Sequence, residues 1–343
     1  MSRSKIGRIL LVSTLAAVVV ACGDDEVKPA AEEPTQESAT APVEATATAT
    51  AEEAASAGEG IVLAINPWTG SAVNANVAKV VLESELGTPV SFVEIDEFAT
   101  WPGMEDGSID AVLEVWPSGH AADFETYIDT NKTVVSLGEL GPVAKIGWYV
   151  NTAIVDAHPE LATWEGFEDP ALAGLFATAE TGDLGQFLMG DPTYVTFDEQ
   201  IIANLGLPLQ YVVGGSEAAV LTAIDNATVD APVLVQFWKP HWKHLEADLT
   251  EITLPPVTDE CLASAAAADG GYACDYAPDV LVKSASAKLQ AKNAVAFDFL
   301  SKFQLTTDQQ SEIAGYVDRD GMTAAEAAAK WVADNPDVVA AWL

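Results

Sequence analysis

Basic residues are scarce in this chain, and histidines and cysteines are scarcer still. Its 343 residues include 15 Lys and Arg against 52 Asp and Glu, which gives a formal net charge of -37 at pH 7. A surface this negative repels phosphate, so we do not expect nucleic acid as a partner. The 4 histidines lack partners at the spacing of metal ligands, so we expect no metal site and no cofactor.

Familiar catalytic motifs are missing as well. The sequence contains no Gly-x-Ser-x-Gly elbow, no phosphate-binding loop, no dinucleotide-binding Gly-x-Gly-x-x-Gly and no His-Glu-x-x-His. Glu114, with Asp110 upstream and Trp116 beside it, could pass for a glycosidase carboxylate, but tryptophans that stack on sugars do not make a hydrolase. We therefore expect a binding protein and not an enzyme.

The N-terminal apolar run is too short to cross a bilayer. It extends over 12 residues from Ile9 to Val20, whereas a membrane-spanning helix needs roughly 20. Three basic residues precede the run and Cys22 follows it, which is typical of a secretory signal over residues 1–21. The small residues before Cys22 resemble a bacterial lipobox, so we expect Cys22 to be lipidated; an ordinary signal with a stray cysteine is the alternative.

Residues 22–59 contain no aromatic side chain and are rich in Ala, Thr, Glu and Pro. Such a segment buries too little apolar surface to repay the entropy of ordering, which predicts a disordered linker that carries the lipidated cysteine. The two remaining cysteines, Cys261 and Cys274, are close in sequence and lie in the exported part. A disulfide between them is the simplest expectation.

Short apolar runs alternate with helical patterns from residue 60 onward, which is typical of an α/β protein with mainly parallel sheets. We expect two lobes, each with a sheet flanked by helices, and a cleft between them. Lobe 1 comprises residues 60–145 plus 255–343, and lobe 2 comprises 146–254. Strands are expected at 61–65, 90–95, 111–115, 146–150, 211–213 and 233–237, and helices at 72–86, 98–106, 197–205, 218–225 and over most of 287–343.

Three tryptophans follow predicted strands in turn-like contexts. Trp68 lies in Asn-Pro-Trp-Thr-Gly, Trp116 in Glu-Val-Trp-Pro-Ser, and Trp238 in Phe-Trp-Lys-Pro-His. Ligands of open α/β sheets bind at the carboxyl ends of the strands. We therefore expect these indoles to face one another across the cleft between the lobes.

These motifs and their order resemble the substrate-binding proteins of ABC importers for glycine betaine, choline and proline betaine. The resemblance covers nearly all of residues 60–343. It is carried by Asn-Pro-Trp-Thr-Gly at 66–70, Gly-Ser-Ile-Asp-Ala at 107–111, Glu-Val-Trp-Pro-Ser-Gly-His at 114–120, Gly-Trp-Tyr-Val at 147–150, Trp-Lys-Pro-His-Trp-Lys at 238–243 and the helical tail.

The resemblance implies a two-lobed periplasmic-binding-protein fold and a cage of three or four aromatic rings around a quaternary ammonium group. Trp68, Trp116 and Trp238 match three rings of the family. Tyr194 stands in the turn where the family carries another tryptophan.

A betaine would also need donors for its carboxylate. The backbone of Thr69 and Gly70, the turn at 194–195, and the imidazole of His241 are the expected donors. The sequence does not choose between this arrangement and one for a hydroxyl.

The function that the resemblance implies is an extracytoplasmic, lipid-anchored solute receptor, monomeric, that serves a permease and an ATPase on separate chains. Glycine betaine is the first expectation for its ligand. The alternatives are choline, carnitine or proline betaine, or a ligand-sensing module that is not coupled to transport.

Overall fold

The computed structural model describes residues 59–264 and 270–343. The predicted signal at 1–21, Cys22 and the linker up to residue 58 lie outside these residues. Within the described part of the chain, no helix is both long and apolar enough to span a bilayer.

The first lobe begins with three parallel strands in the order β2-β1-β3. They are β1 (Ile61–Ile65), β2 (Val90–Glu94) and β3 (Ala111–Val115), connected by the helices α1 (Thr69–Ser84) and α2 (Glu97–Asp106). The side chain of Asp96 caps α2 by accepting a hydrogen bond from the Ala99 amide, and Gly107 ends it in the left-handed conformation. The carboxyl ends of β1 and β3 thus lead directly into Trp68 and Trp116.

The second lobe repeats this plan with parallel strands in the order β7-β5-β6. They are β5 (Gly185–Met189), β6 (Leu209–Val213) and β7 (Leu234–Lys239), with α6 (Asp198–Leu205) and α7 (Glu217–Asn226) between them. Trp238 lies inside β7, one residue short of its end, whereas the sequence predicted that the strand stops before it.

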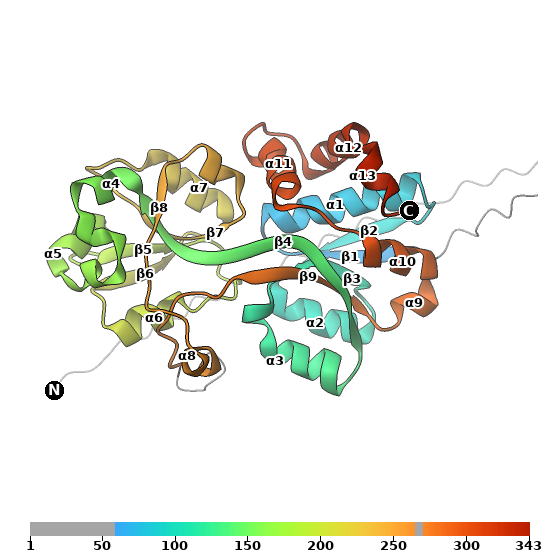
Figure 1. Cartoon of the computed structure of the whole chain (residues 1–343), viewed down its shortest axis with the longest axis horizontal. Coiled ribbons are helices and arrows are strands. Elements are labelled where there is room, and N and C mark those ends of the chain that lie inside the picture. Colours follow the sequence, from blue (N-terminus) through green and yellow to red (C-terminus); the bar gives the residue numbers. More distant parts are fainter. Residues whose placement is uncertain (1–58, 265–269) are drawn as a thin grey trace, which may run out of the picture. The chain divides into compact units, whose positions relative to one another are not determined.

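A single long strand joins the lobes. β4 (Val134–Asn151) pairs with β9 (Asp279–Ser286) along its first part and with β7 and β8 (Leu249–Glu251) along its last part, always antiparallel. Figure 1 shows β4 running from one lobe to the other beside β9. The sheets are therefore parallel at their outer strands and antiparallel at the centre, and the two-lobed α/β class is as expected.

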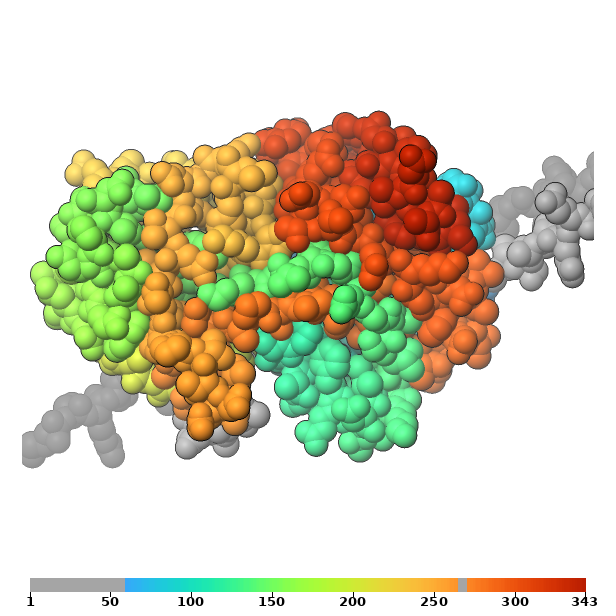
Figure 2. Space-filling model, viewed as in Figure 1, coloured from blue at the N-terminus to red at the C-terminus, as the bar shows by residue number. Residues whose placement is uncertain are grey.

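In the C-terminal tail, α11 (Thr307–Asp318) and α12 (Ala324–Asp334) pack along α1 of the first lobe (Figure 1). In the space-filling view this tail and the second lobe occupy opposite halves of the described chain, with β4 and β9 crossing between them (Figure 2). The remaining helices are α3 (Ala121–Asp123), α4 (Thr152–Ala157), α5 (Pro170–Ala173), α8 (Asp259–Ser264), α9 (Leu289–Lys292), α10 (Ala294–Lys302) and α13 (Pro336–Ala340).

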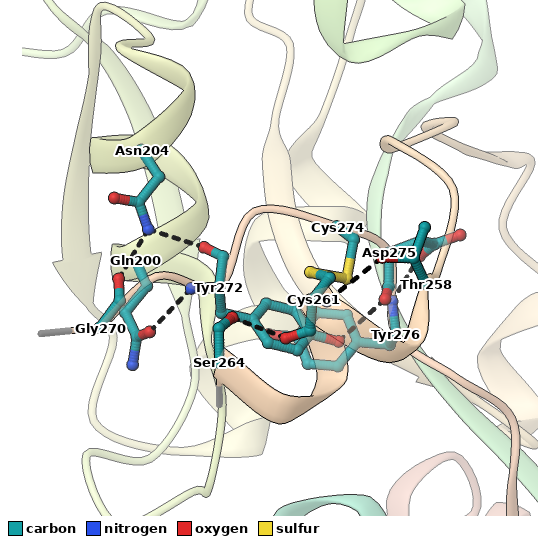
Figure 3. Close-up of a disulfide and its surroundings, with 10 residues drawn as sticks. All are labelled: Gln200, Asn204, Thr258, Cys261, Ser264, Gly270, Tyr272, Cys274, Asp275 and Tyr276. Atoms are coloured by element: carbon teal, nitrogen blue, oxygen red, sulfur yellow. Dashed lines mark hydrogen bonds between the residues drawn. A yellow bond between two sulfur atoms is a disulfide. The ribbon is translucent and has the colours of Figure 1, made fainter. Parts of the chain in front are cut away.

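Cys261 and Cys274 are joined by a disulfide whose loop docks on α6 (Figure 3). The side-chain amide of Asn204 donates to the carbonyls of Gly270 and Tyr272, at 2.7 and 2.9 Å. Tyr272 and Tyr276 lie in the core cluster around Trp148, which is that of the second lobe. The chain therefore re-enters the first lobe only at β9, later than the predicted boundary at 255, because these apolar rings are buried on the second lobe's core.

Candidate ligand-binding site

Six aromatic side chains line one cavity between the lobes: the four rings expected from the sequence, with Phe197 and Tyr276. Trp68 caps α1 and Trp116 follows β3 in the first lobe; Tyr194, in the loop after β5, and Trp238, on β7, come from the second. The three indoles are 8 to 9% exposed, so their ring faces meet little solvent. The structure thus brings together all four rings that the sequence singled out.

Tyr194 connects the rings of the two lobes. Its ring meets that of Trp68 and that of Trp238 edge to face, each with centroids 5.9 Å apart. Its hydroxyl donates to the carbonyl of Pro67 at 3.0 Å. Since Pro67 and Tyr194 belong to different lobes, this contact requires the closed arrangement in which the cavity exists.

A carboxylate also lines the cavity. Glu97, at the start of α2, accepts a hydrogen bond from the Val195 amide at 3.1 Å and pairs with Nε2 of His120 at 2.9 Å. Burial by itself lowers the pKa of His120, but its hydrogen bonds to Asp123 and Glu97 outweigh this and raise the pKa to about 9. His120 is therefore charged at neutral pH and balances Glu97.

Gln236 is the other polar group of interest at the cavity. It is two residues before Trp238 on β7, so both side chains point to the same face of the sheet. It is 2% exposed, and its Oε1 is among the described buried atoms that have no hydrogen-bond partner. Buried amide groups rarely stay unpaired, so this side chain is available for a ligand.

Three predicted donors lie elsewhere. The Thr69 amide donates to Oε2 of Glu217 at 2.8 Å, and Nε2 of His241 pairs with Oε1 of the same carboxylate at 2.8 Å. Gly70 lies behind the ring of Trp68, where an added Cβ would approach Oε2 of Glu114 to 2.9 Å. Thr69, Gly70 and His241 therefore do not line the aromatic cavity. The amide of Val195, in the other predicted turn, is occupied by Glu97.

Glu217, His241 and Asp318 form a cluster whose oxygen and nitrogen atoms lie within 4.8 Å of one another. Such a set could in principle bind a metal ion. However, each of the two carboxylates already accepts a hydrogen bond from the opposite lobe. Glu217 accepts from the amide of Thr69, and Asp318 accepts from the indole of Trp242 at 2.8 Å. Burial, and next the charge of Glu217, raise the pKa of Asp318. As found, the cluster holds the closed lobes together.

The sequence did not single out Glu97, Gln236 or Tyr276 as cavity residues. Glu97 lies just past the end of β2, and Gln236 lies on the same face of β7 as Trp238. The local sequence could therefore have identified both as cavity residues. No local sequence signal identifies Tyr276, because the fold of the disulfide loop brings it to the cavity. Trp148, by contrast, is fully buried against Phe187 and donates to Asp198 at 2.7 Å, away from the cavity.

Comparison with known proteins gives one family match. The family described as the substrate binding domain of the ABC-type glycine betaine transport system matches residues 59–334. A trimethylamine N-oxide-binding protein of Pelagibacter ubique is 29% identical over 285 residues, which cover 81% of this chain and 88% of that protein.

Solved structures with the same fold include two proteins with bound ligand. A lactococcal protein in its closed conformation with glycine betaine superposes with a TM-score of 0.62 at 19% identity, covering 83% of this chain and 99% of that one. A choline-binding protein of an ABC transporter, in complex with choline, gives 0.65 at 18% identity, covering 83% and 91%. At these identities the likeness concerns the fold alone.

Proposed function

Because the chain belongs to the family of substrate-binding domains of ABC-type glycine betaine transport systems, we propose that it captures a small trimethylated ammonium compound in the aromatic cavity between its lobes. Members of this family are solute-binding proteins and not enzymes. They work outside the cytoplasm and deliver their ligand to a permease and an ATPase.

The observation that carries the proposal is the convergence of Trp68, Trp116, Tyr194 and Trp238 on one cavity. A trimethylammonium group has no N–H to donate, and its charge is spread over methyl groups that also favour apolar contact. Aromatic faces satisfy both needs, and a desolvated cation-π contact contributes up to about 2 kcal/mol. Three or four such contacts supply much of the roughly 8 kcal/mol of a micromolar complex, before the costs of ordering.

The polar groups at the cavity favour a ligand without a free carboxylate. Its described lining includes Glu97 and contains no Lys, Arg or His, and the donors expected for a betaine carboxylate are engaged elsewhere. The side-chain amide of Gln236 suits one short polar group: its Oε1 can accept from the hydroxyl of choline, and its N–H can donate to the oxide of trimethylamine N-oxide. We therefore place these two ahead of glycine betaine, and the name of the Pelagibacter relative points the same way.

Calorimetric titration of the purified protein tests this function. We expect saturable binding of trimethylamine N-oxide and choline, with glycine betaine weaker. Trp238→Ala should weaken binding by at least about tenfold, because a desolvated cation-π contact is lost while the fold remains. Trp148→Phe is the matched control, since this indole lies outside the cavity. Absence of binding by all three ligands would contradict the proposal, and unchanged affinity in Trp238→Ala would remove this ring from the cage.

We also propose that Cys22 is lipidated and that the folded region, as a monomer, is tethered to the membrane by the linker. The sequence pattern at residues 1–22 and the extracytoplasmic work of the family support this. Labelled fatty acid should be incorporated into the wild-type protein expressed in bacteria and should be absent from Cys22→Ala. Equal labelling of both proteins would overturn the assignment.

A further inference from the structure

Glu114 lies directly behind two rings of the cavity. It is on β3, 3% exposed, with the indole N–H groups of Trp68 and Trp116 both donating to its Oε1, at 2.8 and 3.1 Å. Its Oε2 accepts from the side-chain amides of Asn74 and Gln310, at 2.7 and 2.6 Å. One carboxylate thus binds four N–H donors from three segments of the chain, namely the start of α1, the end of β3 and α11.

This arrangement fits the ionised form of Glu114. An ionised carboxylate only accepts hydrogen bonds, whereas a protonated one would turn an O–H toward one of the four donors. No basic side chain among the described residues forms an ion pair with it, so its negative charge is not cancelled locally. A buried charge without a counter-ion is costly, and a bound cation would supply one.

We infer that Glu114 is the buried counter-ion of the cage: it fixes the planes of Trp68 and Trp116 and makes the cavity prefer a cation to a neutral molecule of the same shape. The inference rests on the proposed function and adds the residue that sets charge selectivity. Hydrogen bonds from the indoles to an anion make their ring faces more negative, which strengthens the attraction that the ring quadrupole already exerts on a cation.

The chain packs closely around the carboxylate of Glu114. At Gly70, in the first turn of α1, a Cβ would lie 2.9 Å from Oε2 of Glu114 and 3.2 Å from Nε2 of Gln310. A side chain there would displace the carboxylate from the indoles. The glycine that the sequence marked as a possible ligand donor thus serves the counter-ion instead.

Several titratable groups surround the carboxylate. Burial raises the pKa of Glu114 to about 7, the hydrogen bonds from Trp68, Trp116 and Gln310 oppose this, and the charge of Glu217 adds to it. His241 and Asp318 stand next to Glu217, and Glu97 and His120 line a small hollow together with Glu114. Because a cation stabilises the ionised form, its binding should release a proton near neutral pH.

A pair of ligands that differ only in charge tests the inference. Choline and 3,3-dimethyl-1-butanol have the same shape, but the second has carbon in place of the charged nitrogen. In the wild type, choline should bind more tightly. Glu114→Gln should reduce that preference by about tenfold or more, because a buried unit charge is removed. Gln310→Met, measured at pH 8.5, is the control that removes one hydrogen bond and keeps the carboxyl group, and should preserve the preference.

Measuring the affinity of the wild type at several pH values gives a second test, which does not depend on whether a variant folds. The affinity of the wild type for choline should rise from pH 6 to pH 8.5, and that for 3,3-dimethyl-1-butanol should stay flat. Equal losses for both ligands in Glu114→Gln, or a flat wild-type profile for choline, would overturn the counter-ion role. A wild type that binds neither ligand would instead refute the proposed function, and the inference with it.

Discussion

At the scale of single residues, His120 holds in place Glu97, a residue that lines the cavity. It is buried beneath Trp101, and its two nitrogens face the carboxylates of Glu97 and Asp123 at 2.9 and 2.8 Å. Glu97 in turn holds the amide of Val195 from the other lobe. One charged histidine thereby keeps a carboxylate in place at the edge of the ligand cavity.

This pairing predicts a pH-dependent contribution to stability. The pKa of His120 is raised above the ordinary value of 6.5 to about 9. A group with a raised pKa stabilises the fold fully below the unfolded pKa and loses that contribution as the pH rises through the folded one. The difference in unfolding free energy between the wild type and His120→Gln should therefore be largest below pH 6.5 and shrink as the pH rises through 9.

Chemical denaturation at several pH values measures this difference. His158→Gln offers a control at a half-buried position outside the cavity, and should show no such trend. A His120→Gln variant whose deficit is the same at pH 6.5 and pH 9.5 would show that the residue acts by packing alone.

The rings of the cavity could be predicted from local sequence, but the groups around them could not. Trp68, Trp116 and Trp238 stand at or near strand ends, and a strand end is visible in the sequence. Three of the four partners of Glu114 come from positions 40 to 196 residues away from it, and the sequence alone does not show which buried polar groups will meet. The same holds for Thr69 and His241, whose polar atoms are engaged by Glu217 and not by the cavity.

At the scale of elements, the disulfide loop shapes one edge of the cavity. Tyr276 lines the cavity two residues after Cys274, and its hydroxyl donates to Asp198 at 2.8 Å while accepting from the Phe197 amide at 2.8 Å. These contacts hold Tyr276 independently of the disulfide. The crosslink therefore matters more for stability than for the ligand.

Replacing both cysteines by serine should lower the unfolding free energy by on the order of 3 kcal/mol, the loop-entropy value for a closed loop of about this length. Choline affinity should change by less than about threefold, since Tyr276 keeps its hydrogen bonds. Thermal unfolding and calorimetry measure the two effects. Free thiols in the exported wild-type protein, or an affinity loss as large as that of Trp238→Ala, would contradict this expectation.

Local patterns predicted β1, β2, β3, β6, β7 and the last part of β4, and missed β5, β8, β9 and the first part of β4. β1 and β3 were predicted to the residue because both are short, mainly apolar runs that end at turn signals. The first part of β4 contains Gly138, Gly141 and Pro142, which are turn signals, and β9 follows the disulfide loop. Both are strands because they pair with each other, and pairing between distant segments overrides local preference.

At the scale of the whole molecule, hydrogen bonds between the lobes close the cavity, and the negative charge of the surface attracts cations toward it. Tyr194 to Pro67, Thr69 to Glu217 and Trp242 to Asp318 are hydrogen bonds between lobes, so the described structure is the closed state. A hollow beside Trp68 is lined by Glu94, Asp96 and Asp191, among others. On a chain with a net charge of -37, this acidic surface attracts cations toward the gap between the lobes.

A crystal structure of the exported protein with choline tests the central claim most directly. The account predicts that the three N-methyl groups lie against the faces of Trp68, Trp116 and Trp238, with Tyr194 closing the fourth side and the hydroxyl near Gln236. Choline bound at another place, or lobes closed on a cavity in which these rings leave the ligand untouched, would contradict it.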